Sequence, residues 1–206
     1  MMVELATHWP EHLGHMLAPS NRNSVASLVK TGLPWSLDNG AFSGFDPVSF
    51  RRRLRLVQGQ PGLLWIVCPD RVGDASATLQ LFEAWREEVA QAGPVAFAGQ
   101  DGAEDTDIPW ERFDCWFVGG STRWKLSRAS ADLATEAKRR HKWLHVGRVN
   151  SLRRLRACYD LGADSVDGSG YSRFAAVARL KGRSDMLLER HLAYLGELEE
   201  QRRLFA

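Results

Sequence analysis

The segment LLWIVCPDRVGDASATLQLFEAWREEVAQAGPVAFA, at residues 63–98, decides the fold class. Its two ends, Leu63–Cys68 and Val95–Ala98, are short apolar runs that predict buried strands. Between them, Asp74–Gln91 carries apolar residues at helical spacing, with Asp74 as a candidate N-cap. A strand, a helix and a second strand in this order predict one unit of a parallel α/β sheet.

The same alternation of apolar runs and amphipathic stretches continues on both sides of this segment. Further strands are expected at Trp35–Asp38, Cys115–Val118, Trp143–Val146 and Asp164–Asp167, with His15–Ala18 as a weaker opening strand. Further helices are expected at Pro47–Val57, Ser127–Arg140, Ser151–Leu161, Tyr171–Arg179 and Ser184–Arg203. Six or seven such units suit either a doubly wound sheet or a TIM-type barrel.

Composition excludes several classes of protein. The chain has 206 residues, 44% of them hydrophobic, and a formal net charge of +2. No apolar run approaches the ~18 residues that span a membrane, and the N-terminus lacks the pattern of a signal peptide. Cys68, Cys115 and Cys158 form no CxxC pair, so neither a disulfide framework nor a cysteine zinc site is expected. We therefore expect a cytoplasmic protein that does not bind a membrane.

Polar or glycine clusters follow nearly every expected strand, and they favour the barrel. In a parallel barrel the carboxyl ends of the strands converge on one face, where active sites are built. No GxGxxG follows the first strand and no GxxxxGK[ST] occurs, which removes the main support for a nucleotide-binding doubly wound fold. We expect an α/β protein with a single compact or incomplete TIM-type barrel over residues 1–206. One cavity would then gather Asp38, Asp70, Gln100, Gly119, Gly120, Arg148 and Asp167.

These residue types suggest glycosidic chemistry on a heterocyclic base. Two carboxylates at separate strand ends, Asp38 and Asp167, suit a nucleophile and an acid–base partner. Asp70 and Gln100 offer hydrogen-bond acceptors and donors to the edge of a base. Phe42 is placed to stack on a ring, although a phenylalanine in such a loop is more often part of the core. Taken singly, each of these polar residues is more often a turn residue than a chemical group.

Basic residues are concentrated between positions 121 and 156. This segment holds eleven Arg and Lys residues against two acids. It is either a footprint for a phosphate backbone or a pair of solvated helix faces, and composition alone does not decide between them. Arg123, Lys125 and Arg148 follow strand ends and are the candidate phosphate contacts. Trp124 between them is a candidate for contact with single-stranded DNA, whereas His145, on an apolar strand, is expected to be a hydrogen-bonded core residue.

The order of these motifs resembles the tRNA-guanine transglycosylase superfamily, in particular its small DpdA-like branch from phages and bacteria, which places 7-deazaguanines in DNA. LDNGAF at 37–42 is similar to the family's Asp-Ser-Gly-Gly-aromatic segment, and GADSVDGSG at 162–170 is similar to the string that carries its covalent nucleophile. PD at 69–70, AGQDG at 98–102 and VGGST at 118–122 resemble its base-binding segments, and HVGRVNS at 145–151 resembles the strand and loop that follow. The resemblance covers roughly residues 35–175.

The resemblance implies a TIM-type barrel and a guanine or 7-deazaguanine transglycosylase. Asp167 would be the nucleophile, with Asp164 as a weaker candidate, and Asp38 the acid–base residue. No metal and no organic cofactor would be needed. The base would be held by Phe42, Asp70, Gln100, Gly119 and Gly120. The expected partners are guanine-containing DNA, single-stranded or with a flipped-out base, a free 7-deazaguanine and a possible DNA-recognition protein, in the cytoplasm of a bacterium or a phage-infected host.

Two departures from the family pattern affect this interpretation. The chain shows no cysteine/histidine zinc site at its end, which favours DNA over tRNA as the substrate. DNGAF replaces Asp-Ser-Gly-Gly-aromatic, so the turn after Asp38 is expected to differ. Three alternatives stay open: a glycosylase that releases the base to water, a non-catalytic nucleic-acid-binding barrel, and, less favoured because no lysine lies at an expected strand end, a TIM-barrel lyase or aldolase.

Overall fold

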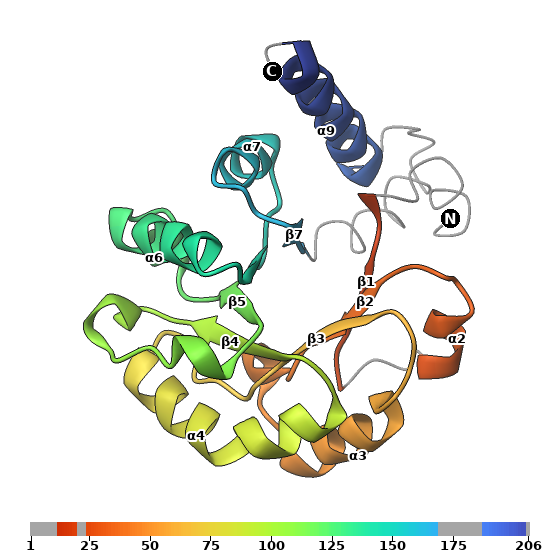
Figure 1. The fold of residues 1–206 in the computed structure, drawn as a ribbon, viewed down its shortest axis with the longest axis vertical. Helices are drawn as coiled ribbons and strands as arrows, with labels where there is room; N and C mark the ends of the chain where they lie inside the picture. The colour runs from red at the N-terminus through yellow and green to blue at the C-terminus, as the bar shows by residue number, and fades with distance from the viewer. Residues whose placement is uncertain (1–11, 20–23, 169–186, 205–206) are drawn as a thin grey trace.

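Seven parallel strands form one curled sheet, a half-barrel, in the computed structural model (Figure 1). The structure describes residues 12–19, 24–168 and 187–204. The strands follow one another across the sheet in chain order, and each pairs in parallel with the next. They are β1 (His15–Leu17), β2 (Trp35–Leu37), β3 (Leu63–Val67), β4 (Val95–Gly99), β5 (Cys115–Val118), β6 (Trp143–Val146) and β7 (Ser165–Val166).

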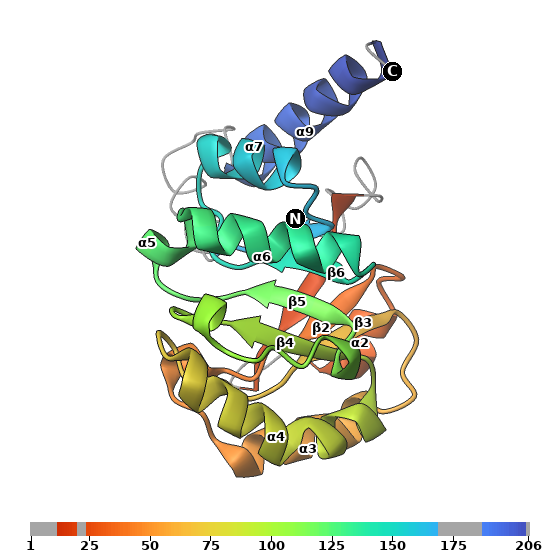
Figure 2. The same cartoon turned by 60° about the vertical axis from the view of Figure 1, so that its left-hand side comes forward.

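Helices cover the outer face of the curled sheet (Figures 1 and 2). The helices of the described residues are α2 (Val25–Val29), α3 (Pro47–Val57), α4 (Ala75–Ala92), α5 (Thr122–Lys125), α6 (Arg128–Arg139) and α7 (Leu152–Asp160), together with α9 (Leu187–Leu204), which lies beside α7 and extends away from the sheet. Short 3₁₀ turns lie at Ala41–Ser43, Ala103–Asp105 and Trp110–Arg112. Within the described ranges, no helix combines the length and the apolar character needed to cross a bilayer.

Side-chain caps fix the starts of the helices, as expected from the sequence. The carboxylate of Asp74 accepts a hydrogen bond from the backbone N–H of Ala77 at 2.9 Å, which begins α4. Asp46 caps α3 in the same way, with Pro47 in the first turn. Each cap satisfies a backbone donor that has no partner inside the helix. The predicted Asp74 cap and the predicted helix start at Pro47 are confirmed.

The expected strands agree with the observed ones to within two residues at either end. Two short helices, α2 and α5, were not expected, because a helix of four or five residues has too few positions to show periodicity. The closing helix begins at Leu187 in the described part, and the expected helix Tyr171–Arg179 lies outside the described residues.

Different clusters of side chains pack on the two faces of the sheet. Large side chains such as those of Trp35, Phe97 and Trp116 pack outward against the helices in the main core. Trp65 and Val67 belong to a smaller cluster on the inner face, with other side chains from β4 and β5. Successive side chains of a strand point to opposite faces. The inner-face positions of three strands therefore continue, past the strand ends, into Asp38, Gln100 and Asp167.

Candidate active site

The polar residues singled out from the sequence lie along one rim of the half-barrel. All seven strands are parallel, so their carboxyl ends share this rim. It carries Asp38 after β2, Asp70 after β3, Gln100 after β4, Gly119 and Gly120 after β5, Arg148 after β6 and Asp167 after β7. Contacts and charge interactions described below join members from opposite ends of this series, so they form one site.

Asp70 is held by two amide side chains from neighbouring strand ends. Asn39 Nδ2 donates to Asp70 Oδ1 at 2.7 Å and to the carbonyl oxygen of Cys68 at 2.6 Å. Gln100 Nε2 donates to Asp70 Oδ2 at 2.5 Å. Burial raises the pKa of the Asp70 carboxyl above its ordinary value, against the opposing effect of these two hydrogen bonds and of the charge of Arg148. The three side chains form a fixed polar plate with acceptors and donors, suited to the edge of a flat base.

Gly119 and Gly120 support Gln100. Gly120 N–H donates to Gln100 Oε1 at 2.8 Å, and Gly73 N–H donates to the same oxygen at 2.9 Å. Gly119 N–H donates to the carbonyl oxygen of Gly99 at 2.9 Å. The amides of both glycines are thus already engaged inside the protein, so a base could meet them only if these bonds opened. Their role in contacting a base stays a prediction.

Replacing Gly119 by alanine should damage this plate. A Cβ atom there would lie 2.5 Å from Gln100 Nε2 and 3.0 Å from the carbonyl oxygen of Gly99, both too close for a carbon atom. The Gln100 amide would have to leave Asp70, and we expect G119A to lower the free energy of unfolding by about 1–3 kcal/mol, the cost of leaving a buried polar group without its partner. Urea denaturation measures this. If the effect passes through Gln100, G119A should add little to Q100A, and full additivity of the two substitutions would contradict it.

Asp38 is a carboxyl group whose pKa is moved upward. Burial, and the negative charges of Asp70 and Asp167, raise the pKa of Asp38 to about 6, in spite of backbone N–H groups of Gly40 and Asn39 that favour its ionised form. Such a carboxyl is half protonated at about pH 6. It can therefore give and take protons at physiological pH, as a general acid and base must.

The pKa of the Asp167 carboxyl is shifted in the opposite direction, below its ordinary value. Burial raises the pKa of its carboxyl, but contact with His145, the backbone N–H of Arg148 and the charge of Lys125 together lower it below the ordinary value. Arg148 N–H donates to Asp167 Oδ1 at 3.0 Å, and His145 Nε2 lies 3.2 Å from the same oxygen. The side chain stays 29% exposed. Asp167 is thus an ionised carboxylate with access to a ligand.

Arg148 closes the rim between Phe42 and Gly120. Its guanidinium lies 4.9 Å from the centre of the Phe42 ring, and one guanidinium N–H donates to the carbonyl oxygen of Gly120. Phe42 is 71% exposed, so the expectation that a phenylalanine in such a loop belongs to the core is wrong here. An exposed aromatic face beside a guanidinium can stack on a base.

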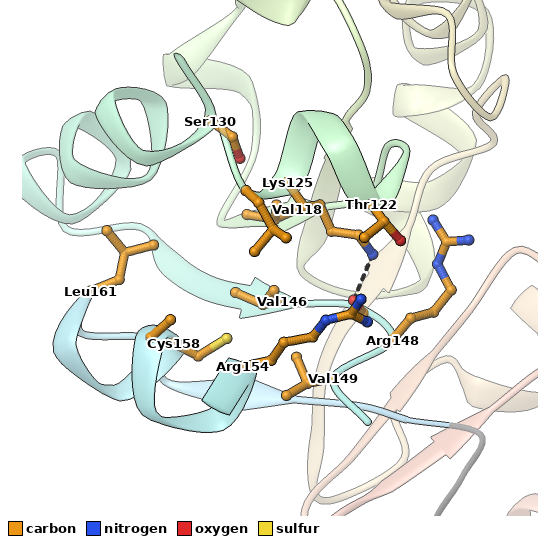
Figure 3. Close-up of a pocket in the computed structure, with 13 residues that line it drawn as sticks. Val118, Thr122, Lys125, Ser130, Val146, Arg148, Val149, Arg154, Cys158 and Leu161 are labelled. Carbon is orange, nitrogen blue, oxygen red and sulfur yellow. Dashed lines mark hydrogen bonds between the residues drawn. The ribbon is translucent and has the colours of Figure 1, made fainter. Parts of the chain in front are cut away.

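Of the three candidate phosphate contacts, two line a hollow beside the rim, on the helix side of β6 (Figure 3). Lys125 Nζ donates to the carbonyl oxygen of Gly147 at 2.7 Å, and Arg148 and Arg154 complete the cationic part of the lining. Burial, followed by the positive charge of Arg148, lowers the pKa of Lys125 to about 8. Arg123 is exposed and is not part of this lining. Contact of Lys125 and Arg148 with a phosphate stays a prediction.

Other basic residues of the 121–156 segment pair with acids on the outside. Lys138 lies 2.7 Å from Asp164, and both Arg139 and Arg140 bind Glu136. Asp164 is therefore exposed on the helix side and is not the nucleophile candidate. This part of the segment is the solvated face of α6.

Trp124 is buried, which corrects the expectation that it contacts DNA. Only 6% of its surface is exposed, and its indole N–H donates to Glu104 Oε2 at 2.7 Å. Its ring also fills the space beside Gly120. The basic neighbours Arg123 and Lys125 suggested an exposed aromatic, but the side chain of a short helix has to face the core on one side.

Sequence reasoning missed two members of the site. Asn39 was part of a quoted motif but was given no role, and His145, although it could line the cavity, was expected to be a hydrogen-bonded core residue with no link to Asp167. His145 is indeed buried and hydrogen-bonded, and its hydrogen bonds lead to Asp167. The period-two pattern of β6 could have placed His145 on the inner face with Asp167, since Gly147 and Arg148 follow it at the rim.

Among the described residues, no group of three His, Cys, Asp or Glu side chains is arranged to hold a metal ion. The polar groups of the site are carboxylates, amides, an imidazole and a guanidinium. No model of a known protein family matches this chain, and no curated protein matches it either.

Proposed function

We propose that this protein is a pentosyltransferase that exchanges guanine or a 7-deazaguanine in nucleic acid, DNA in the first place, through a covalent aspartyl-glycosyl intermediate. The observation that supports this most is the opposite tuning of two carboxyl groups on one rim: the pKa of Asp38 is raised and that of Asp167 is lowered. Pairs of titratable groups pushed apart by their surroundings mark acid–base and nucleophile roles. The half-barrel would be the described part of a TIM-type barrel.

In the proposed reaction Asp167 attacks C1′ of the target nucleotide and forms a glycosyl ester. The bond between C1′ and the base breaks, its electron pair leaves with the base, and Asp38 supplies the proton. A second base then loses a proton to Asp38 and attacks C1′, and the ester bond to Asp167 breaks. The pKa of Asp38, about 6, suits both proton transfers.

The base would lie against the plate of Asn39, Asp70 and Gln100. A carboxylate accepts hydrogen bonds from the N1–H and exocyclic amine of guanine, and the second N–H of the Gln100 amide can donate to its O6. Phe42 would stack on the ring, with Gly119 and Gly120 behind Gln100. Other bases do not offer two donors and an acceptor in this order, which favours guanine.

Lys125 and Arg148, with Arg123 further out, would contact the phosphates that flank the target nucleotide. A duplex target must first flip its base out of the stack, at a cost of a few kcal/mol. The small number of cations on this rim supports a single-stranded substrate or a separate DNA-recognition protein.

Labelled guanine and a labelled 7-deazaguanine, incubated with the protein and with single-stranded DNA, duplex DNA or tRNA, test the proposal. We expect label to enter DNA and not tRNA. Base release without entry of label would instead identify a hydrolytic glycosylase. Salt-sensitive binding without any bond cleavage, unchanged when both Asp38 and Asp167 are replaced, would identify a non-catalytic binding protein and refute the proposal.

A further inference from the structure

A line of four side chains runs through the inner face of the half-barrel and ends at Asp167. Trp143 Nε1 lies 2.8 Å from Ser165 Oγ, Ser165 Oγ lies 2.8 Å from His145 Nδ1, and His145 Nε2 lies 3.2 Å from Asp167 Oδ1. Trp143 and His145 are alternate residues of β6, and Ser165 and Asp167 are alternate positions of β7 and its end. The register pairs His145 with Ser165, so the two strands place all four on one face.

The two end groups, an indole and a carboxylate, fix the direction of the hydrogen bonds along this line. An indole N–H can only donate, and an ionised carboxylate can only accept. Trp143 therefore donates to Ser165 Oγ, and His145 must present an N–H to Asp167 from Nε2. In the neutral imidazole, Nδ1 is then an acceptor, and the Ser165 hydroxyl donates a hydrogen bond to Nδ1. Each group donates to the next, from Trp143 through Ser165 and His145 to Asp167.

The histidine ring is held firmly in this orientation. His145 is only 3% exposed, and its ring stacks on Phe117 with centroids 4.7 Å apart and an interplanar angle of 28°. The ring of Trp65 lies against it at 4.8 Å. A ring fixed by its neighbours loses little conformational entropy when it forms its hydrogen bonds, so it can hold a partner in place.

A second donor reaches the same oxygen from the backbone. Arg148 N–H donates to Asp167 Oδ1 at 3.0 Å, and Arg148 has a φ of 61°, a left-handed conformation that costs energy for a residue with a side chain. Both donors thus bind Oδ1. Within the described residues, no hydrogen bond is made to Oδ2.

We propose that His145 is a positioning residue that, with the Arg148 amide, holds Oδ1 of Asp167 and leaves Oδ2 as the attacking atom. The inference rests on the proposed function, in which Asp167 is the nucleophile. In the first step Oδ2 bonds to C1′ while the C1′–base bond breaks, and Oδ1 becomes the carbonyl oxygen of the ester. In the second step the C1′–Oδ2 bond breaks, its electron pair returns to the carboxylate, and the two N–H donors stabilise that returning charge.

Substitutions along the line test this role. His145→Phe keeps a flat ring between Phe117 and Trp65 but has no N–H, whereas His145→Gln keeps an amide N–H close to the same place. We expect H145F to lower the kcat of base exchange about 100-fold with the KM for DNA and for guanine within about twofold, and H145Q to recover about tenfold of that loss. An unchanged kcat in H145F, or a loss that falls on KM, would overturn the inference.

Two further measurements keep the inference testable if H145F does not fold. Ser165→Ala removes the hydroxyl that donates to Nδ1 of His145, and we expect this substitution to lower kcat about tenfold. The ¹⁵N chemical shifts of His145 in the unmodified protein report the tautomer directly. A proton on Nδ1 of a neutral ring would overturn the proposed direction whatever the activity.

The same assay separates this inference from the proposed function. Exchange that is lost in Asp167→Asn but intact in H145F and S165A overturns the role of His145 alone. Exchange that survives in Asp167→Asn overturns both, because the nucleophile is then a different group. Failure of the unmodified protein to exchange or release any base overturns the proposed function, and with it the catalytic role of the line.

Discussion

Replacing Asp167 by asparagine is expected to abolish base exchange, with a fall in kcat of about 10,000-fold or more, as is usual when a covalent nucleophile is removed. An amide oxygen is neutral and a poor nucleophile, so no glycosyl ester can form. The asparagine can still accept the hydrogen bonds from Arg148 N–H and His145 at Oδ1. The fold and the KM for DNA should therefore change little.

Covalent trapping gives the measurement for this variant. Without an added base, the unmodified protein should accumulate an adduct with DNA that survives denaturing electrophoresis, and D167N should form none. Asp164→Asn is the matched control, since Asp164 lies three positions earlier but faces Lys138 on the outside at 2.7 Å. D164N should exchange bases at the normal rate. An adduct in D167N, or its loss in D164N, would show that the nucleophile has been assigned wrongly.

The sheet could be predicted from the sequence because each strand is a compact apolar run between clear breaks. The predicted strands Trp143–Val146 and Cys115–Val118 match the observed strands at both ends. The short β7 was expected to be two residues longer at its ends. The backbone N–H groups of Asp164 and Asp167 still donate to the carbonyl oxygens of Leu144 and Val146 in β6, at 2.8 and 3.2 Å, so the difference concerns only where the strand is taken to end.

The positions of the candidate site residues followed from topology, but their mutual contacts did not. Parallel strands bring their carboxyl ends together, which was enough to expect Asp38, Asp70 and Asp167 on one rim. The bonds of Asn39 and Gln100 to Asp70 depend on turn conformations that the sequence does not fix, such as the left-handed Gly40. The sequence pattern of a buried histidine is the same with or without a carboxylate partner, which is why the link from His145 to Asp167 emerged only from the structure.

Asp38→Asn is expected to remove most of the activity and at the same time to stabilise the fold. Loss of a general acid and base lowers kcat by about 100- to 1,000-fold. Since the folded protein holds the pKa of Asp38 at about 6, above the ordinary 3.8, it binds more protons than the unfolded chain between these values. The free energy of unfolding therefore falls as the pH rises from about 4 to about 6, and stays low above that. Asparagine carries no charge to bury, so D38N should gain about 1–2 kcal/mol near pH 8 and nothing near pH 4.

The pH dependence of activity in the protein without substitutions is a second test of the role of Asp38. In the proposed reaction protonated Asp38 releases the first base, so kcat/KM for DNA should fall as the pH rises through about 6. This fall should be absent from the residual activity of D38N. Asp101, on the same rim after β4, is the matched control for stability. Burial raises the pKa of Asp101, but hydrogen bonds from the Ser121 hydroxyl and amide outweigh it and lower that pKa. Its ionised form is therefore stabilising, and D101N should lower the free energy of unfolding at pH 8. A D38N variant that loses stability as D101N does would show that Asp38 is a structural carboxylate and not the proton donor of the reaction.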